Sequence, residues 1–295
     1  MTELKIGIIG LSEGNGHPYS WSAIFNGFDS YYMKDCPFPV IPQYLSERQF
    51  PKEFLNEIGT VNSIWTQEIK ISENVAKSAF IKNVCVNIED LIKYSDAILL
   101  ARDDAENHLE MARFFLEQGA PIFIDKPFAT SIVEANEMIH LQRYDYQIFT
   151  CSSLRYAEEL LLSNDDLSNI GQIREIEANC PKYWNTYAVH LLEPIIVNCP
   201  DRGQLLEVKK INSANHTVRI KWENLNTKIT MTGNEPSSLY FKYIGELGEV
   251  SKQFSDSFSC FKSSLRAFVE QVQQKENIIP REETLEIVKI LEDGK

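Results

Sequence analysis

The chain has 295 residues, of which 43% are hydrophobic and 24% are charged, and its net charge is −13. This composition is typical of a folded protein with two domains, and the negative charge disfavours nucleic acid as a partner. We see neither an apolar run of membrane-spanning length nor a secretory signal, so we expect a cytoplasmic protein without a membrane partner. The six scattered cysteines lack a CxxC pair, which predicts no metal site and no disulfide framework.

The first part of the chain alternates predicted strands with predicted helices. Residues 5–10 are an almost continuous apolar run, typical of a strand buried on both faces, and residues 18–27 then have the apolar spacing of a helix. The same reading predicts strands at 61–65, 96–101 and 121–125 and helices at 73–80, 90–93 and 107–118. Strands that alternate with helices predict a parallel, doubly wound sheet with right-handed crossovers.

One segment breaks this alternation. Residues 29–60 contain four prolines and several aromatic side chains, which predicts an insertion with little regular structure. Because these residue types favour order over flexibility, we expect an ordered flap over the mouth of the cofactor or substrate cleft.

The pattern changes after residue 127. Helices are predicted at 131–142 and 185–196, and the region 205–250 consists of short alternating runs typical of antiparallel strands. Two further helices close the chain. The sequence therefore predicts an α/β protein with a Rossmann-like, doubly wound parallel sheet in residues 1–127 and an α+β substrate and oligomerisation domain with a largely antiparallel sheet in 128–295.

The turn after the first predicted strand departs from the dinucleotide-binding pattern G-x-G-x-x-G. Gly10 is kept, but Ser12 and Asn15 occupy the next two glycine positions, and Gly14 and Gly16 lie nearby. We interpret this turn as a remodelled cofactor loop that would bring the backbone close to a pyrophosphate at the free N–H groups of the following helix. An ordinary glycine-bearing turn is the alternative.

Two further positions lie where strands of the parallel sheet end, which is the ligand edge of such sheets. Thr66 stands where NAD enzymes carry an acid for the ribose hydroxyls, so we expect weak discrimination between NAD and NADP. Arg102, together with Asp103 and Asp104, would contact the cofactor ribose or the substrate hydroxyls, or else belong to a solvated turn.

In the stretch "FIDKP", Lys126 follows a predicted strand and so lies at the ligand edge of the parallel sheet. Desolvation lowers the pKa of a lysine and makes it usable as a general acid or base. A surface lysine in a tight turn is the alternative.

Several of these features together resemble the Gfo/Idh/MocA family of NAD(P)-dependent oxidoreductases. Asp125-Lys126-Pro127 is similar to the family's acid-Lys-Pro motif, and "DAILLA", Asn107-His108 and the closing helices resemble their counterparts in the family. The resemblance implies NAD or NADP as cofactor and a homodimer or homotetramer. It also implies hydride transfer between nicotinamide and a hydroxyl or carbonyl of a sugar, cyclitol or nucleotide-sugar-like substrate.

The resemblance also implies roles for individual residues. Lys126 would lie near the nicotinamide, and His190 matches the histidine of the family's D-x-G-x-H motif, which exchanges a proton. This chain departs from that motif, with Thr186 in place of the acid and Ala188 in place of the glycine. The role of the acid is then unfilled, or is taken by Tyr183, Tyr187 or Glu193.

Other side chains near this motif are candidates for substrate binding. Arg155 resembles an arginine at the family's active-site entrance, although a salt-bridged structural arginine is equally consistent with the sequence. The aromatic rings of Tyr183 and Tyr187 would suit a sugar ring, or would pack into the core.

A second class of function competes with the enzyme. The altered glycine loop and the missing motif acid are also compatible with a non-catalytic ligand-binding or regulatory protein on the same fold.

Overall fold

The computed structural model describes residues 3–212 and 215–295, which form two compact units. The first unit consists of Met1–Ala129, Val133–Cys151 and Phe261–Pro280, and the second consists of Thr130–Ile132, Ser152–Cys260 and Arg281–Lys295. In the part of the chain that is described, no helix is long and apolar enough to span a membrane.

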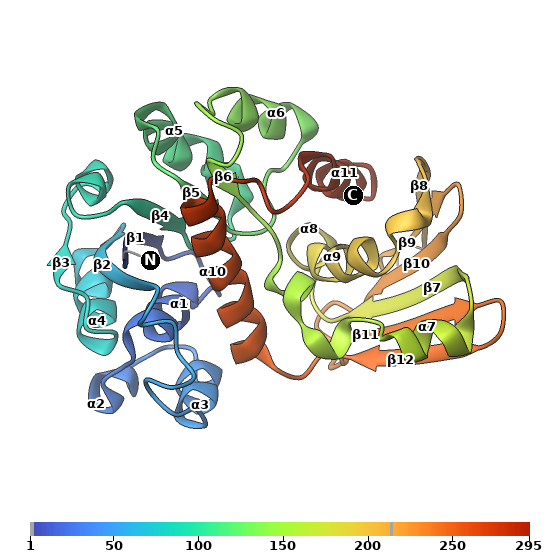
Figure 1. The fold of residues 1–295 in the computed structure, drawn as a ribbon, viewed down its shortest axis with the longest axis horizontal. Helices are drawn as coiled ribbons and strands as arrows, with labels where there is room; N and C mark the ends of the chain where they lie inside the picture. Colours follow the sequence, from blue (N-terminus) through green and yellow to red (C-terminus); the bar gives the residue numbers. More distant parts are fainter. Residues whose placement is uncertain (1–2, 213–214) are drawn as a thin grey trace. The chain divides into compact units, whose positions relative to one another are not determined.

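The first unit is built on a parallel sheet (Figure 1). Its six strands are β1 (Leu4–Gly10), β2 (Gly59–Thr66), β3 (Asn83–Val84), β4 (Ala97–Leu100), β5 (Ile122–Ile124) and β6 (Ile148–Phe149). They lie in the order β3-β2-β1-β4-β5-β6, and every neighbouring pair is parallel. This is the strand order of dinucleotide-binding domains, so the predicted Rossmann-like sheet is confirmed.

Helices connect these strands and cover the sheet. They are α1 (His17–Asn26), α4 (Ile69–Ser78), α5 (His108–Gln118) and α6 (Ile132–His140), with short 3₁₀ turns at Ile88–Lys93 and Ala105–Asn107. Right-handed crossovers place α1 and α4 on one face and α5 and α6 on the other. The predicted end of the helix at 107–118 is confirmed, because Gly119 follows α5 with a left-handed φ of 80°.

A helix from the far end of the sequence completes the first unit. Helix α10 (Ser257–Gln274) packs Phe268 against Phe123 of β5, with ring centroids 5.8 Å apart. Near its start, Phe261 lies 5.0 Å from the ring of His17. The late helix α10 thus supplies side chains to the first sheet and to the start of α1.

The predicted insertion is more regular than expected. It contains helices α2 (Ser30–Met33) and α3 (Val40–Ser46), so the expectation of little regular structure is wrong. Asp29 caps α2 through its side chain, and buried Ile41 and Leu45 anchor α3. The prolines do not prevent α3, because Pro39 is its N-cap and Pro42 lies in its first turn, where an N–H has no partner within the helix.

The second unit contains the second predicted sheet. Its strands are β7 (Ile173–Cys180), β8 (Leu205–Asn212), β9 (Thr217–Trp222), β10 (Asn226–Met231), β11 (Tyr240–Gly245) and β12 (Glu249–Gln253). They lie in the order β12-β11-β7-β10-β9-β8, antiparallel except for β7 and β10. The predicted largely antiparallel sheet is therefore confirmed.

The two faces of this sheet differ in chemistry. Apolar side chains such as Ile220 and Phe241 are fully buried. Lys228 and Glu177 form an exposed ion pair on neighbouring strands. The helices of the unit are α7 (Asn164–Ile170), α8 (Trp184–Tyr187), α9 (Val189–Asn198) and α11 (Arg281–Asp293), with 3₁₀ turns at Ser153–Tyr156, Glu158–Leu160 and Pro200–Arg202.

Each unit is made of three separate segments of the chain, so no single residue forms the boundary between them. The predicted boundary after residue 127 assigns α6, β6 and α10 to the second domain, whereas most of these residues belong to the first unit. The physical reason is pairing and packing: β6 extends the first sheet beside β5, and Gln271 of α10 donates to the backbone carbonyl of Ile148.

Candidate active site

The loop between β1 and α1 uses its glycines for different reasons. Gly10 lies against the ring of Pro18, and a Cβ there would overlap it. Gly14 has a φ of 78° and open space around its missing side chain. At Gly16 a Cβ would overlap the side chains of Phe38 and Ile41. Gly10 and Gly16 therefore permit close packing, and Gly14 alone combines a left-handed turn with an open face.

The expected free N–H groups at the start of α1 are used within the chain. The N–H of His17 donates to Asn15 Oδ1 at 2.8 Å, and Pro18 has no N–H. The N–H groups of Tyr19 and Ser20 both donate to the carbonyl of Gly16. The expectation that this first turn offers free donors to a pyrophosphate is therefore wrong, because Asn15 and a tight turn at Gly16 already occupy them.

The predicted insertion lies against this loop. Phe38 and Ile41 pack on Gly16, and the hydroxyl of Tyr44 donates to Ser20 of α1. The segment is thereby fixed beside the start of α1. Whether it covers a cleft stays a prediction.

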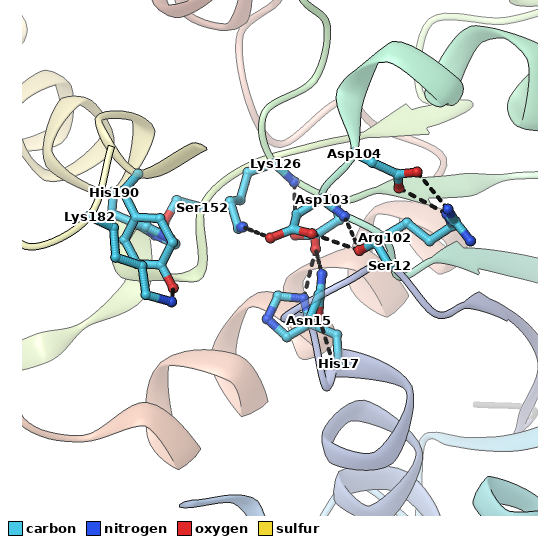
Figure 2. Close-up of polar contacts among 12 residues, drawn as sticks. Ser12, Asn15, His17, Arg102, Asp103, Asp104, Lys126, Ser152, Lys182 and His190 are labelled. Atoms are coloured by element: carbon cyan, nitrogen blue, oxygen red, sulfur yellow. Dashed lines mark hydrogen bonds and ion pairs between the residues drawn. The ribbon is translucent and has the colours of Figure 1, made fainter. Parts of the chain in front are cut away.

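Lys126 lies just after β5 in an ion pair. Its Nζ is 3.3 Å from Asp103 Oδ2, and Ser12 Oγ donates to Asp103 Oδ1 at 2.6 Å (Figure 2). Burial would raise the pKa of Asp103, but the charge of Lys126, the hydrogen bond from Ser12 and the charge of His17 outweigh it and hold that pKa below its usual value. The predicted residues Ser12 and Lys126 are thus brought together by Asp103.

A second buried carboxylate lies beside Lys126 in the sequence. Asp125 is 1% exposed, and its Oδ1 accepts from the N–H of Lys126 at 2.8 Å. Its Oδ2 accepts from Asn15 Nδ2 at 3.0 Å and contacts His17 Nδ1 at 2.7 Å. The predicted residue Asn15 therefore connects the glycine loop to the Asp-Lys-Pro motif.

Arg102 is buried in an internal network. Its guanidinium contacts both carboxylate oxygens of Asp104, and its NH1 donates to the carbonyl of Leu11 and to Gln67 Oε1, each at 3.0 Å. Burial would raise the pKa of Asp104, but hydrogen bonds from Arg102 and Asn107 outweigh it and lower that pKa. The predicted cofactor contact of Arg102 stays a prediction. In the structure, Arg102 links the carboxyl ends of β1, β2 and β4 through Leu11, Gln67 and Asp104.

The end of β2 is also occupied internally. Thr66 is buried, and its hydroxyl donates to the carbonyl of Glu68 at 2.7 Å and contacts the hydroxyl of Ser72. The side-chain amide of the following residue, Gln67, pairs with both the N–H and the carbonyl of Leu11. At this end, neutral groups stand where a dinucleotide site usually has a ribose-binding acid.

These observations decide how a nicotinamide dinucleotide fits the first unit. The open face at Gly14 and the ammonium group of Lys126 suit its phosphate and nicotinamide portions. The end of β2 supplies Thr66 and Gln67 instead of a carboxylate at the strand end. The chain therefore fits the cofactor, with a remodelled site for the adenosine half.

In the second unit, His190 of α9 is held by two neighbours. Its Nδ1 lies 2.6 Å from Ser152 Oγ, and its ring is 4.9 Å from the ring of Tyr187. The ammonium group of Lys182 lies 4.3 Å from the centre of the Tyr187 ring and contacts its hydroxyl (Figure 2). Sequence reasoning missed Ser152 and Lys182, because neither position belongs to a recognisable motif.

Two other predicted residues of this unit form a buried ion pair. Arg155 contacts Glu193 at 2.9 Å and also pairs with Glu283. Glu193 further accepts from the N–H of Ser152, and burial raises its pKa despite the charge of Arg155. These contacts favour the structural reading of Arg155, and they occupy the carboxylate of Glu193, one candidate for the missing acid.

Tyr183 differs from Tyr187 in its surroundings. It is 59% exposed, and its hydroxyl donates to Asn234 Oδ1 at 3.2 Å. It lines a cavity of about 540 Å³ together with Lys182, Trp184, Asn185, His216, Met231, Thr232, Gly233 and Lys295. Among the described residues, no group of three or more His, Cys, Asp or Glu side chains is placed to hold a metal ion, and none of the six buried cysteines is in a disulfide.

Solved structures share this fold across the whole chain. A scyllo-inositol dehydrogenase from Lactobacillus casei is 14% identical, with a TM-score of 0.67 over 98% of this chain and 94% of that one. An oxidoreductase from Thermotoga maritima is 14% identical, with a TM-score of 0.69 over 99% and 95%. GenD2 from gentamicin A biosynthesis, solved with NAD, is 10% identical, with a TM-score of 0.71 over 99% and 93%. These likenesses show the fold alone.

No curated protein matches the chain significantly. A family model does match: the oxidoreductase family with an NAD-binding Rossmann fold, GFO_IDH_MocA, aligns with residues 4–151. That match covers half of the chain and includes the glycine loop, the strand ends and Lys126. The chain therefore belongs to the Gfo/Idh/MocA family of oxidoreductases and has its NAD-binding Rossmann fold.

Proposed function

We propose that this chain transfers hydride between NAD or NADP and a hydroxyl or carbonyl of a sugar, a cyclitol or a nucleotide-sugar-like compound. One observation carries the proposal: Lys126 lies at the carboxyl end of β5 in an ion pair with Asp103, inside a Rossmann unit. That edge of a doubly wound sheet is where ligands bind. A desolvated lysine there can stabilise or protonate the substrate oxygen that changes oxidation state.

As a member of its family the chain is an oxidoreductase that uses a nicotinamide cofactor. The cofactor accepts or returns hydride when it is bound, and the protein supplies orientation and proton exchange. The loop around Gly14 would hold the phosphates, since the first turn of α1 has no donors to spare. Ser12 would orient Asp103, and Asp103 would in turn fix the direction of Lys126.

His190 is the residue of the second unit that we propose for proton exchange. Its contact with Ser152 Oγ fixes the ring, and Tyr187 packs against the ring edge. Thr186 in the acid position of the motif supports a role for Ser152 in orienting the imidazole where the family uses a carboxylate. A hydroxyl stabilises an imidazolium less than a carboxylate does, so the contribution of His190 is expected to be small.

The sugar-like substrate class has two supports. Aromatic side chains with polar rims suit sugar and cyclitol rings, and the cavity beside Tyr183 and Trp184 has this character. The structural likeness to a scyllo-inositol dehydrogenase agrees with a cyclic polyol, although it carries the fold alone at 14% identity. Two lysines at the cavity, Lys182 and Lys295, would also accommodate an acidic group on the ring.

The test is turnover on a panel of cyclitols, aldoses and sugar acids, followed by nicotinamide absorbance with NAD and NADP. Lys126→Ala is expected to reduce kcat by about 10²–10⁴-fold, the usual contribution of a general acid-base group, while cofactor binding by calorimetry persists. Lys93→Ala is the matched control, because Lys93 is exposed and pairs only with Asp90 among the ion pairs of the chain described here. Wild-type kcat in Lys126→Ala would contradict the assignment.

A further inference from the structure

We propose that His17, oriented by Asp125, is a second catalytic acid-base residue, a role that rests on the oxidoreductase function proposed above. His17 is the first residue of α1 and stands outside every motif used to identify the family. Its ring contacts Asp125, the residue that precedes Lys126, with 2.7 Å between Nδ1 and Oδ2.

Asp125 fixes which ring nitrogen carries the proton. Asn15 Oδ1 accepts from the N–H of His17, so the amide nitrogen of Asn15 faces Asp125 and donates to Oδ2. The N–H of Lys126 donates to Oδ1. The carboxylate thus acts as an acceptor, and Nδ1 of His17, 2.7 Å from Oδ2, is the nitrogen that donates.

Aromatic packing fixes the plane of the ring. His17 stacks on Trp21, one turn later on α1, with centroids 4.6 Å apart and an angle of 14°. The ring of Phe261 from α10 lies 5.0 Å away, edge-on. In the described part of the chain no hydrogen bond engages Nε2, and the side chain stays 15% exposed. A fixed imidazole with Nδ1 on a buried carboxylate and Nε2 available has the geometry of the Asp–His pair in catalytic triads.

The Lys126–Asp103 pair explains why a second group is useful. In that ion pair Lys126 is an ammonium group, which donates hydrogen bonds and has no lone pair to accept a proton. It can stabilise a developing oxyanion but cannot remove the hydroxyl proton until it loses its own. An imidazole that donates through Nδ1 has that lone pair on Nε2, and the carboxylate of Asp125 would stabilise the imidazolium formed when Nε2 accepts a proton.

In oxidation the O–H bond of the substrate breaks and its proton goes to Nε2 of His17. The electron pair of the neighbouring C–H bond would leave as hydride to a bound nicotinamide cofactor, and a C=O bond would form. In reduction the imidazolium returns the proton to the carbonyl oxygen. Lys126 would stabilise charge on the oxygen in both directions, and His17 would carry most of the proton transfer, with only the small contribution expected above from His190.

Two substitutions separate catalysis from structure. His17→Asn places an amide N–H about where Nδ1 stands, so it keeps a donor to Asp125 and removes Nε2. His17→Gln places an amide nitrogen about where Nε2 stands and removes the donor to Asp125. We expect His17→Asn to keep the folding stability of the wild type and to lose about 10²–10⁴-fold in kcat on the polyol panel. His140→Gln is the control, because His140 is exposed and bonds to its own helix.

A second readout is independent of turnover. Nitrogen-15 NMR of the five histidines of the unliganded protein, assigned with the His17→Gln variant, should show Nδ1 of His17 protonated and Nε2 unprotonated at alkaline pH. Asp125→Asn should abolish that tautomer preference, which identifies Asp125 as the positioning residue. The opposite tautomer in the wild type would overturn the proposal.

The kinetic outcomes are distinct. If the wild type is active on the panel and His17→Asn keeps full turnover, the role of His17 is overturned. The oxidoreductase function is not affected by that result. Loss of turnover in His17→Asn and retention in His140→Gln would support both. A wild-type chain that turns over no compound of the panel would overturn the proposed function and the role of His17 with it.

Discussion

Asp103 joins Lys126 to Ser12: one carboxylate oxygen lies 3.3 Å from the ammonium nitrogen, and the other accepts the Ser12 hydroxyl at 2.6 Å. Asp103→Asn leaves Lys126 buried beside a neutral amide. We expect a loss of about 3 kcal/mol in the free energy of unfolding at neutral pH, the low end for breaking a buried pair. Urea denaturation measures it. Asp90→Asn, at a partly exposed carboxylate paired with Lys93, is the control and should change little.

The same pair gives a pH dependence. The pKa of Asp103 is lower in the folded chain than in the unfolded chain. Its stabilising contribution is therefore present at pH values above the unfolded pKa and disappears as pH falls through the folded pKa. The difference in unfolding free energy between wild type and Asp103→Asn should shrink in acid. A difference that stays constant down to strong acid would contradict the direction of the shift.

Arg102 should be sensitive even to a conservative change. Its planar fork contacts Asp104, the carbonyl of Leu11 and Gln67 at once, and lysine cannot reproduce that geometry. We expect Arg102→Lys to destabilise the chain by about 2–3 kcal/mol and to weaken cofactor binding, since the glycine loop loses an anchor. Denaturation and calorimetry test both effects. Arg174→Lys, in an exposed pair with Glu246, is the matched control.

The glycines of the loop make a testable contrast. At Gly16 an added methyl group meets Phe38 and Ile41, so Gly16→Ala should cost about 1–3 kcal/mol through overpacking. At Gly14 the methyl group meets open space, and Gly14→Ala should cost only about 1–2 kcal/mol from its positive φ. If Gly14 faces the cofactor, Gly14→Ala should reduce cofactor affinity more than stability, and the reverse order of effects would argue against that.

Discrimination between the two cofactors should be weak. Thr66, the last residue of β2, is itself uncharged, and its hydroxyl is already engaged with Glu68 and Ser72. We expect modest affinity for both NAD and NADP in a calorimetric titration. A preference above about 100-fold, or roughly 2.7 kcal/mol, would show that another residue reads the ribose.

The chain is expected to form a homodimer or homotetramer through its second sheet. The outer face of that sheet bears charged pairs such as Lys228 with Glu177, so the association should weaken at high salt, where the charges are screened. Light scattering at micromolar concentration tests this. Lys228→Glu should favour the monomer and Lys289→Glu on α11 should not, whereas a monomer under all conditions would contradict the expectation.

Local sequence signals determined the first sheet and the position of Lys126. Uninterrupted apolar runs fix buried strands because any polar side chain there would lose its hydrogen bonds to water. The left-handed stop at Gly119 and the lysine after "FID" follow from residue type and position alone. Such signals act over a few residues, so they are legible without the rest of the fold.

Tertiary structure decided what those residues contact. Nothing near His17 in the sequence indicates that Asp125, over a hundred residues later, would lie 2.7 Å from its Nδ1, or that Phe261 would pack on its ring. Likewise, the sequence indicates that Gly16 is a cofactor-binding glycine, whereas in the structure it packs against Phe38 and Ile41. Hydrogen bonds and close packing between distant segments depend on the register of strands and the return of α10, which local propensity does not encode.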